Sequence, residues 1–370
     1  MITPPATLGV LGGGQLGRYF VMAARTMGYR TVVLEPDPDA PAGSVADEHL
    51  VAAFDDEAAL QHLASVCSAV TTEFENPPAA ALEWLGNHTI VRPSPAAVAI
   101  TQDRRTEKAF LDRAGIRIAP FSVIENENDV EAAATFEYPA ILKTARLGYD
   151  GKGQITIRAH GLLARAWEEL QRKPCVLEQR LNLDSELSVV LARTTSGQTA
   201  VYPAAANTHV AGILDCTIVP HNMPGAAELA EAIAGALDYV GVLAVEMFVV
   251  DGRLLVNELA PRPHNSGHWT LDAARTSQFE QQVRAVCGAG LGDPSLRAPA
   301  AAMVNLLGDL WLDGEPNWSA ALASPDVSLH LYGKQTPRPG RKMGHLTVTA
   351  ETPDQAERLA RAIRSNLTLG

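Results

Sequence analysis

Two lysines, one arginine and three glycines fall within the short segment from Lys143 to Gln154. Glycines allow a loop to fold closely over a polyanion and to donate its backbone amides, while the ammonium groups of Lys143 and Lys152 would neutralise phosphate charge. A solvated hairpin tip with an Asp-Gly turn is the alternative interpretation. The convergence of basic residues and glycines favours a mobile loop that binds a polyphosphate.

Carboxylates and an amide oxygen recur on two neighbouring apolar runs near residue 250. Glu246 lies in the first run, and Asn257 and Glu258 lie in the second. Oxygen ligands of this kind suit Mg²⁺ beside substrate phosphates, whereas two exposed strand glutamates are the alternative. A hairpin loop of only residues 251–252 would place Glu246 opposite Asn257. We therefore predict a three-residue loop, 251–253, or an equivalent bulge, which sets Glu246 opposite Glu258, with a cation offsetting their repulsion.

Hydrogen-bond donors crowd the segment that follows this hairpin. Arg262 is suited to clamp a small oxyanion, and Asn265 and the histidines are suited to orient it. Zinc binding by His264 and His268 is disfavoured, because that spacing suits a helix and the intervening Pro and Gly residues oppose one. Near the C-terminus, a Pro/Gly-rich loop carries a further set of basic residues, which indicates either a phosphate clamp or a solvated turn: Lys334, Arg341 and Lys342.

The turn at residues 12–17, GGGQLG, fits the pattern G-x-G-x-x-G, and Glu35 follows where a ribose-binding acid would stand. Its glycines and the following helix N-terminus are suited to receive a phosphate. A dinucleotide site, a site for another phosphate-bearing ligand and simple tight packing all stay open for this turn.

A mixed α/β chain is expected to position these groups. Before residue 100, apolar runs alternate with helical patterns, which predicts a doubly wound parallel sheet; the runs are 7–11, 31–34 and 69–72. From 120 to 258, short strand-like runs predict an α+β domain with an antiparallel sheet. Three further runs and a helix at 353–365, capped by Thr352, predict a small β-rich C-terminal domain. The predicted boundaries are 1–100, 101–297 and 298–370.

Composition excludes several classes of protein. The chain has 370 residues, of which 46% are hydrophobic and 19% charged, with a formal net charge of −12. These values are typical of globular domains and show no basic footprint for nucleic acid or an anionic membrane surface. No apolar run is long enough for a membrane span, and a cytoplasmic protein is expected. The four cysteines lack metal or disulfide spacing and are predicted to be reduced core residues.

The chain resembles an ATP-grasp ligase in the order of its motifs. These are the glycine turn, the lysine strand with its loop, the hairpin with Glu246, Asn257 and Glu258, and the basic tail. Within that superfamily the chain is most similar to the 5-(carboxyamino)imidazole ribonucleotide synthetases, the ATPase components of phosphoribosylaminoimidazole carboxylation. The strings LGGGQLGR, TTEFENP, QDRRTEK, GYDGKGQ, NELAPRPHNSGHWT and GRKMGH carry this resemblance from end to end. It implies a pre-ATP-grasp domain, an ATP-grasp domain with a glycine-loop lid, and a C-terminal domain that completes the substrate site.

The resemblance also implies roles for individual residues. ATP contacts are expected from Arg104, Lys143, Gly148, Gly151, Gly153, Gln154, Glu178, Gln179, Arg180, Leu181, Glu186, His209, Asn257 and Glu258, with the choice between Arg104 and Arg105 open. Glu246 and Glu258 are expected to hold Mg²⁺, or Mn²⁺ in its place. The expected catalytic residues are Tyr149, Asp150, Lys152 and Arg262. Contacts to the ribonucleotide are expected from Gln15, Leu16, Glu73, Asn76, His264, Asn265, Lys334, Arg341 and Lys342.

The implied reaction is the ATP-dependent carboxylation of 5-aminoimidazole ribonucleotide with bicarbonate, through carboxyphosphate, in purine biosynthesis. A homodimer and a downstream mutase partner are implied as well. Two alternatives are kept. One is a formate-dependent glycinamide ribonucleotide formyltransferase, which shares the layout, and the other is a nicotinamide-dependent oxidoreductase built on the first glycine turn.

Overall fold

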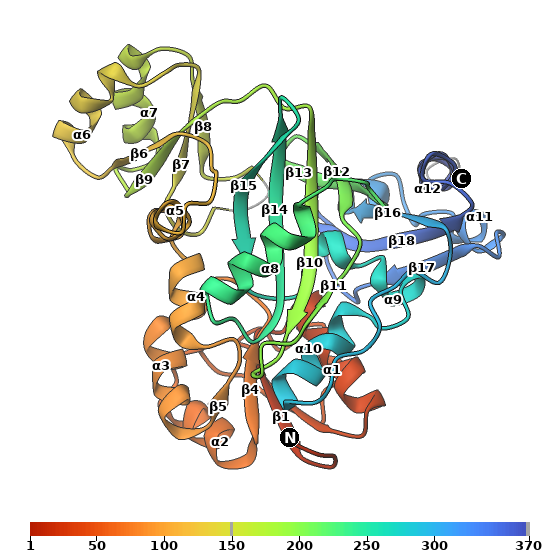
Figure 1. The fold of residues 1–370 in the computed structure, drawn as a ribbon. Helices are drawn as coiled ribbons and strands as arrows, with labels where there is room; N and C mark the ends of the chain where they lie inside the picture. Colours follow the sequence, from red (N-terminus) through yellow and green to blue (C-terminus); the bar gives the residue numbers. More distant parts are fainter. Residues whose placement is uncertain (149–150, 368–370) are drawn as a thin grey trace.

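The computed structural model describes residues 1–148 and 151–367. Its N-terminal part is a five-stranded parallel sheet in the order β3-β2-β1-β4-β5. Helices α1 and α10 lie on one face and α2 and α3 on the other (Figure 1), and their apolar residues pack against the sheet. Because both faces are buried, the strands are continuous apolar runs, and the predicted doubly wound sheet is confirmed. The elements of this part are β1 (Thr7–Leu11), α1 (Gln15–Thr26), β2 (Arg30–Leu34), β3 (Glu48–Leu50), α2 (Glu57–Val66), β4 (Ala69–Thr72), α3 (Ala79–His88), β5 (Ile90–Val91) and α4 (Pro95–Thr101).

A small antiparallel sheet follows, in the order β6-β9-β7-β8, with α6 and α7 packed on it. Its strand β7 delivers Lys143 to the start of the glycine loop, and β8 begins where that loop ends. The elements of this part are α5 (Arg104–Arg113), β6 (Phe121–Ile124), α6 (Glu127–Ala132), β7 (Ala140–Thr144), β8 (Gln154–Ile157), α7 (Leu163–Glu169) and β9 (Cys175–Gln179).

The remaining strands form one large antiparallel sheet, in the order β15-β14-β10-β12-β13-β16-β18-β17, with β11 beside β10. The predicted antiparallel ATP-grasp sheet is therefore present. The C-terminal strands extend this same sheet through pairing of β13 with β16, and α12 covers them. The elements are β10 (Ser185–Arg193), β11 (Thr199–Val201), β12 (Ala205–Val210), β13 (Ile213–Val219), α8 (Ala226–Ala236), β14 (Gly241–Val250), β15 (Arg253–Ala260), α9 (Thr270–Ala273), α10 (Gln278–Cys287), β16 (Ala300–Leu307), α11 (Trp318–Leu322), β17 (Val327–Leu331), β18 (Lys342–Ala350) and α12 (Pro353–Asn366).

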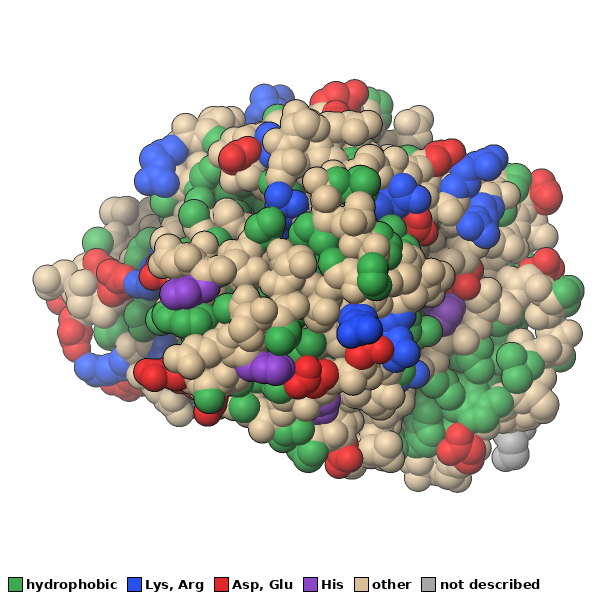
Figure 2. All heavy atoms as spheres, turned by 90° about the horizontal axis from the view of Figure 1, so that it is seen from below, with side chains coloured by type: hydrophobic (Ala, Val, Ile, Leu, Met, Phe, Trp, Pro, Cys, Tyr) green, Lys and Arg blue, Asp and Glu red, His purple; other side chains and the backbone are tan. Residues whose placement is uncertain are grey.

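Several local predictions are confirmed at the level of single residues. The Thr352 side chain accepts a hydrogen bond from the Gln355 amide and caps α12. All four cysteines are free and buried, as expected for reduced core residues. Among the described helices, none is long and apolar enough to cross a membrane. Acidic and basic side chains are interspersed over the face shown in Figure 2, and no continuous basic stripe crosses that face.

Candidate functional site

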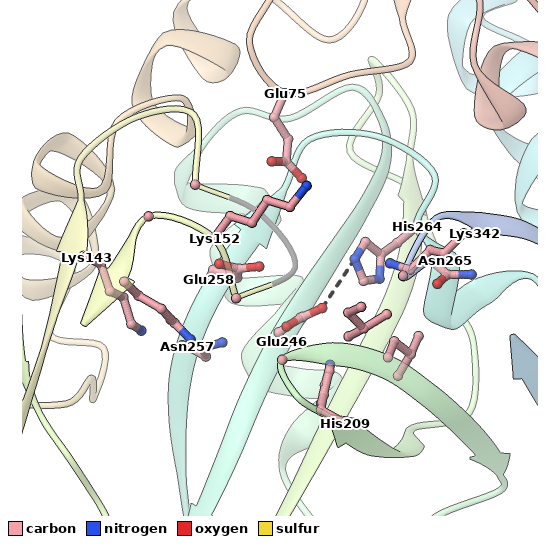
Figure 3. A pocket seen from close by; sticks show the side chains of 18 of the residues that line it. Glu75, Lys143, Lys152, His209, Glu246, Asn257, Glu258, His264, Asn265 and Lys342 are labelled. Atoms are coloured by element: carbon pink, nitrogen blue, oxygen red, sulfur yellow. Dashed lines mark ion pairs between the residues drawn. The ribbon is translucent and has the colours of Figure 1, made fainter. Parts of the chain in front are cut away.

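A single cavity of about 940 Å³ lies where the glycine loop, the large sheet, the N-terminal turn and the basic tail meet. It brings together predicted residues that are separated by up to 327 positions in the chain, and Figure 3 shows many of their side chains. The predicted residues in its lining are Gln15, Leu16, Arg104, Lys143, Gly148, Gly151, Lys152, Gly153, Gln154, Glu186, His209, Glu246, Asn257, Glu258, Arg262, His264, Asn265, Lys334, Arg341 and Lys342.

Other predicted residues do not line this cavity. Glu178, Gln179, Arg180, Leu181 and Glu73 are absent from its wall, while Asn76 lines a smaller adjoining pocket together with Arg104 and Glu258. Tyr149 and Asp150, two of the four predicted catalytic residues, lie outside the described residues.

The hairpin of β14 and β15 places the two predicted metal-binding carboxylates side by side. Val250 pairs with Arg253, so the loop has only two residues and the predicted three-residue loop is wrong. A bulge after Glu246, which leaves Asn257 unpaired, restores the register and sets Glu246 opposite Glu258. The equivalent bulge that the carboxylate argument required is therefore confirmed.

Arg104, rather than Arg105, faces the cavity. Its Nη1 lies 2.9 Å from Glu258 Oε2. The Arg105 side chain instead points toward the N-terminus of α5, where its Nε lies 2.9 Å from Asp103 Oδ1. Burial raises the pKa of Glu258, but Arg104 and Lys143 outweigh it and hold that pKa below its usual range. Glu258 is therefore ionised at neutral pH.

Glu246 lies in a different electrostatic environment. Its Oε1 is 3.2 Å from His264 Nε2, as drawn in Figure 3. Burial, together with the charge of Glu258, raises the pKa of Glu246 to about 7. Burial also lowers the pKa of His264 well below its usual value, so this imidazole is neutral. Two neighbouring carboxylates with opposed pKa shifts are suited to a site where a cation arrives and leaves.

Asn257 supplies the observation that tests the fit of a metal ion. Its Oδ1 is buried and has no hydrogen-bond partner among the described residues. A buried amide oxygen without a partner is costly, and it lies on the residue next to Glu258 in the bulge. One free amide oxygen and two carboxylates form the hard oxygen set that Mg²⁺ takes beside phosphates, so these residues fit the ion.

The end of the cavity that was predicted to bind ATP is built on buried ion pairs. Lys143 Nζ lies 2.8 Å from Glu178 Oε2, and Lys108 Nζ lies 3.6 Å from Glu178 Oε1. Glu178 thus fixes two lysines from behind the cavity wall. On the opposite wall His209 Nδ1 lies 2.9 Å from Glu186 Oε2. Burial lowers the pKa of His209, but Glu186 raises it above its usual value overall.

The described residues of the glycine loop line the cavity between β7 and β8: Gly148, Gly151, Lys152 and Gly153. Gly153 has a φ of 72°, and a Cβ at this position would lie 2.6 Å from Thr144 Oγ1, so only glycine fits. Lys152 extends from the loop across the cavity toward Glu75 (Figure 3). Glu75 in turn forms an ion pair with Arg262. The loop and the Arg262 segment therefore meet over the space between the carboxylates and the N-terminal turn.

At the far end, basic residues of the C-terminal segment face the cavity. Lys334 Nζ donates to the Lys342 carbonyl oxygen at 2.8 Å, which ties the start of the basic loop to its end. Arg341 Nη1 donates to the Thr336 carbonyl oxygen at 2.7 Å. Arg338, which the sequence analysis did not single out, joins them in the lining. This concentration of positive charge in an acidic protein is suited to a phosphate group.

Comparisons with known proteins cover most of the chain. Residues 5–102 match the family described as the ribonucleotide synthetase preATP-grasp domain, 109–279 the ATP-grasp domain and 301–359 the phosphoribosylaminoimidazole carboxylase C-terminal domain. N5-carboxyaminoimidazole ribonucleotide synthase from Bacillus subtilis is 42% identical, over 96% of this chain and 94% of the relative. The same enzyme from Brucella melitensis is 44% identical, over 94% of this chain and 97% of the relative.

The chain belongs to the N5-carboxyaminoimidazole ribonucleotide synthase family. Solved structures of the family agree with this. The Staphylococcus aureus synthetase with ADP has a TM-score of 0.91 and 37% identity and covers 98% of both chains. The Aspergillus clavatus synthase with ADP and 5-aminoimidazole ribonucleotide has a TM-score of 0.87 and 29% identity and covers 99% of both. The resemblance stated from the sequence is confirmed, and neither the formyltransferase nor the oxidoreductase alternative is supported.

The glycine turn shows why a dinucleotide does not fit this synthase-family chain. The Gly13 amide donates to Glu35 Oε2 at 2.8 Å, and the Gly14 and Gly17 amides donate to Glu73 at 2.9 Å each. The amides that would bind a pyrophosphate are thus satisfied by the protein's own carboxylates. Glu73, predicted to contact the ribonucleotide, instead holds the turn that presents Gln15 and Leu16 to the cavity.

Glu73→Ala is expected to lower the free energy of unfolding by about 2–3 kcal/mol, because two amides lose their acceptor in a buried place. Glu73→Gln keeps one oxygen acceptor, so its free energy of unfolding should lie between those of the wild type and Glu73→Ala. Glu83→Ala, at an exposed position on α3, is the control and should change stability by less than about 0.5 kcal/mol. Urea denaturation measures all three, and an unchanged midpoint for Glu73→Ala would contradict the assigned role.

Helix α5 holds the bulge that carries Asn257 and Glu258, two of the predicted metal-binding residues, and the sequence analysis missed this. Glu107 Oε1 accepts from the Leu259 amide at 2.7 Å, and Lys108 Nζ donates to the Asn257 carbonyl oxygen at 2.8 Å. Two consecutive residues of α5 thus hold β15 through hydrogen bonds to the residues before and after Glu258. The only signal in the sequence was a Glu-Lys pair inside an otherwise ordinary helix, which does not reveal a partner 149 positions away.

Glu107 also predicts a pH dependence. Burial raises its pKa to about 8, so the folded chain keeps a proton that the unfolded chain releases near pH 4.5. This group's contribution to stability is complete below pH 4.5 and is lost as pH rises to about 8, by up to about 1.4 kcal/mol per pH unit. Glu107→Gln retains the acceptor and should flatten the fall in unfolding free energy between pH 5 and 8. Identical pH profiles of variant and wild type would remove Glu107 as the cause.

Proposed function

We propose that the chain catalyses the carboxylation of 5-aminoimidazole ribonucleotide with bicarbonate, forming ADP and phosphate, in purine biosynthesis. One observation carries this proposal. A single continuous cavity joins the loop, lysine and carboxylates suited to ATP with the basic tail and N-terminal turn suited to a phosphorylated second substrate. ADP and 5-aminoimidazole ribonucleotide are named together in the complex of the Aspergillus clavatus relative, which supports the same pair of ligands here.

ATP would lie against the β7, β8 and β15 side of the cavity. Arg104, Lys143 and the loop residues Gly148, Gly151, Gly153 and Gln154 would contact its phosphates, and Glu186 and His209 would hold the ribose side. Gln179, Arg180 and Leu181 remain the proposed adenine neighbours through their place at the end of β9. Glu178 acts by fixing Lys143.

Mg²⁺ would be held by Glu246, Glu258 and the Asn257 amide oxygen, with Mn²⁺ as a substitute. When bound, the ion would neutralise charge on the transferring phosphoryl group. Arg104 keeps Glu258 ionised and aimed at that place. The α5 contacts hold the β15 residues on either side of Glu258, and the pairing of β14 with β15 sets Glu246 opposite Glu258.

The ribonucleotide would occupy the opposite end. Lys334, Arg341 and Lys342 supply positive charge for its phosphate, while Gln15 and Leu16 come from the turn that Glu73 holds. Asn265 is fixed by the buried Asn305, whose Nδ2 donates to Asn265 Oδ1 at 2.7 Å. His264, which is neutral, and Asn76 from the adjoining pocket complete the proposed contacts.

The reaction divides into two displacements. A bicarbonate oxygen attacks the γ-phosphorus of ATP, ADP leaves, and carboxyphosphate forms. The 5-amino nitrogen then attacks the carbon of carboxyphosphate, or of CO₂ released from it in the closed site; in either case phosphate leaves and the nitrogen loses one proton. Lys152 and Arg262, with Tyr149 and Asp150, would hold bicarbonate and the intermediate. Water must be excluded meanwhile, because carboxyphosphate hydrolyses readily, and the glycine loop is placed to act as the lid. A homodimer, a mutase partner and a cytoplasmic location stay predictions.

Phosphate release from Mg-ATP tests the proposed function directly. The assay is run with 5-aminoimidazole ribonucleotide and bicarbonate, and in parallel with glycinamide ribonucleotide and formate. We expect turnover only in the first mixture, dependent on both substrates and giving a labile carboxylated product. Phosphate release only with glycinamide ribonucleotide and formate would overturn the proposed substrates in favour of the formyltransferase. No phosphate release in either mixture would overturn them as well.

Lys152→Ala is expected to lower the rate of carboxylation while leaving ribonucleotide binding largely intact. Loss of one positioned cation near developing phosphoryl charge is worth about 10²-fold in kcat. Lys173→Ala, an exposed lysine before β9, is the matched control and should retain wild-type turnover. Wild-type kcat in Lys152→Ala would remove this residue from the mechanism.

A further inference from the structure

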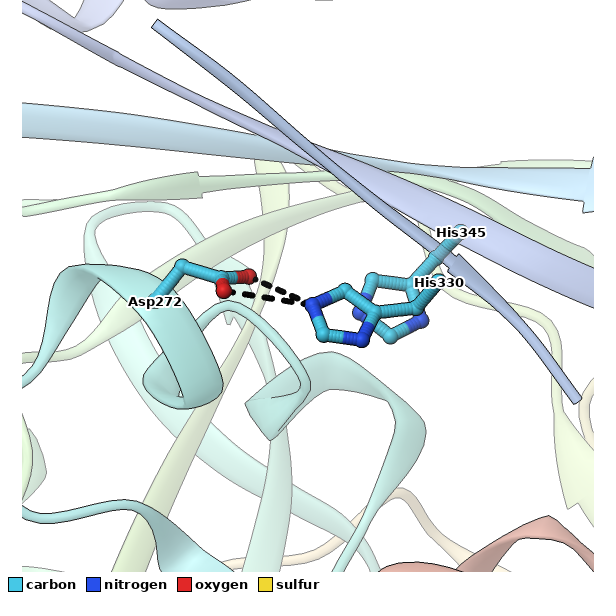
Figure 4. A group of neighbouring side chains, drawn as sticks. All are labelled: Asp272, His330 and His345. Atoms are coloured by element: carbon cyan, nitrogen blue, oxygen red, sulfur yellow. Dashed lines mark hydrogen bonds and ion pairs between the residues drawn. The ribbon is translucent and has the colours of Figure 1, made fainter. Parts of the chain in front are cut away.

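Outside the proposed active site, one aspartate and two histidines converge on a single point. They are Asp272 on α9, His330 on β17 and His345 on β18, and their ligand atoms all lie within 4.8 Å of one another. Figure 4 shows the carboxylate facing the two imidazole rings. None of the three lines the nucleotide cavity, so the group is separate from the Glu246 and Glu258 pair.

The sheet itself fixes the two histidines in place. His330 and His345 are direct partners in the antiparallel ladder of β17 and β18, so both side chains project from the same face. Their rings are stacked, with centroids 4.7 Å apart and an interplanar angle of 14°, so the partly exposed His330 ring must rotate for both rings to bind one ion. Asp272 approaches from α9, with Oδ2 2.9 Å from His330 Nε2. The three donors are therefore positioned by regular elements rather than by loops.

His345 provides an independent sign that a ligand is missing. The residue is fully buried, and its Nε2 has no hydrogen-bond partner among the described residues. Its Nδ1 is engaged by the Tyr332 hydroxyl at 3.0 Å. In the tautomer whose Nδ1–H donates to that hydroxyl, Nε2 carries the lone pair that a metal ion would take. A second hydrogen bond that fixes the tautomer and ring orientation is typical of metal-binding histidines.

We propose that Asp272, His330 Nε2 and His345 Nε2 bind one divalent transition-metal ion of the zinc class. Two imidazoles and one carboxylate favour such an ion over Mg²⁺, which takes oxygen ligands. The Asp272 and His330 side chains are 22% and 24% exposed, which leaves room for a water molecule in the fourth position. The ion would take the place of the direct contact between His330 Nε2 and Asp272 Oδ2.

The ion would join two parts of the molecule that frame the active site. Asp272 follows the segment that carries His264 and Asn265, whereas β17 and β18 flank the basic loop with Lys334 and Lys342. Metal binding would therefore stabilise the attachment of the C-terminal strands to the ATP-grasp segment. The site acts on structure, and the proposed carboxylation does not pass through it.

Cobalt and zinc titrations of the full-length, chelator-treated protein test the site, in excess Mg²⁺ so that the carboxylate pair is occupied. We expect one equivalent of Co²⁺ to give a visible d–d band, and one equivalent of Zn²⁺ to bind at micromolar or lower concentration in competition with a chromophoric chelator. Zinc should also raise Tm. Absence of the band and of stoichiometric Zn²⁺ binding would overturn the proposal.

Variants locate the metal on these residues. His330→Ala and Asp272→Asn change the partly exposed ligands and should each weaken Zn²⁺ binding at least tenfold and abolish the zinc-dependent rise in Tm. His62→Ala is the control, because His62 forms a similar histidine–carboxylate pair with Glu48, at 2.9 Å, away from the cluster. Unchanged affinity in His330→Ala would overturn the assignment even if the protein binds zinc elsewhere.

Discussion

Glu258→Gln is expected to lower kcat/KM for ATP by about 10²- to 10³-fold and to raise the Mg²⁺ concentration needed for half-maximal rate. The carboxylate is the ionised member of the pair, because Arg104 and Lys143 hold its pKa down against the effect of burial. Glutamine has the same size and keeps one oxygen that can accept from Arg104, so the fall in kcat/KM reports the effect of the negative charge alone. Initial rates of phosphate release at varied ATP and Mg²⁺ measure both effects.

The control lies on the same hairpin. Asp251→Asn changes a carboxylate at the exposed turn between β14 and β15, where φ is 48° and asparagine is tolerated as well as aspartate. That variant should keep wild-type kinetics. Ribonucleotide binding, followed by calorimetry without ATP, should be unchanged in Glu258→Gln. A variant with wild-type dependence on Mg²⁺ would show that Glu258 does not hold the ion.

Apolar runs predicted most of the strands, and two of the elements that were not predicted contain buried polar side chains. The hairpin of β12 and β13 was missed, since Asn207 and Thr217 face inward and satisfy each other at 2.9 Å. Helix α10 was missed for the same reason. Its inner face carries Gln282, whose Nε2 donates to Thr71 Oγ1 at 2.9 Å. A sequence shows hydrophobic periodicity, but it does not show which buried polar side chain has a partner on another element.

Residue types near the site were predicted better than their contacts. Glu246 and Glu258 were placed together by a register argument, and the required bulge was found. Glu73 was assigned to a ligand, although its carboxylate satisfies amides of the glycine turn some 56 to 59 positions earlier. The choice between Arg104 and Arg105 depended on Asp103, which caps the helix and also retains Arg105. Such choices are made by three-dimensional partners, which spacing along the chain does not reveal.

Lys108→Met is expected to lower the free energy of unfolding by about 3–5 kcal/mol and to weaken ATP binding at least tenfold. The Lys108 side chain is fully buried and has two tasks. It shares the Glu178 carboxylate with Lys143, and it holds the Asn257 carbonyl in the bulge. Methionine fills the volume but leaves Glu178 with one partner and the bulge with one fewer bond. The free energy of unfolding should therefore fall, and the oxygens of the proposed metal site should be held less firmly in place.

A double-mutant cycle separates the two tasks. Glu178→Gln removes the buried negative charge, so the double variant with Lys108→Met should recover part of the stability lost in the single variants, with a coupling of about 1–3 kcal/mol. ATP affinity should not recover, because the bond to Asn257 stays broken. Arg113→Met, exposed on the same helix α5, controls for helix propensity and should be neutral. Additive effects on the free energy of unfolding would show that Lys108 and Glu178 do not interact. Restored ATP affinity in the double variant would show that the hydrogen bond from Lys108 to the Asn257 carbonyl is not needed for ATP binding.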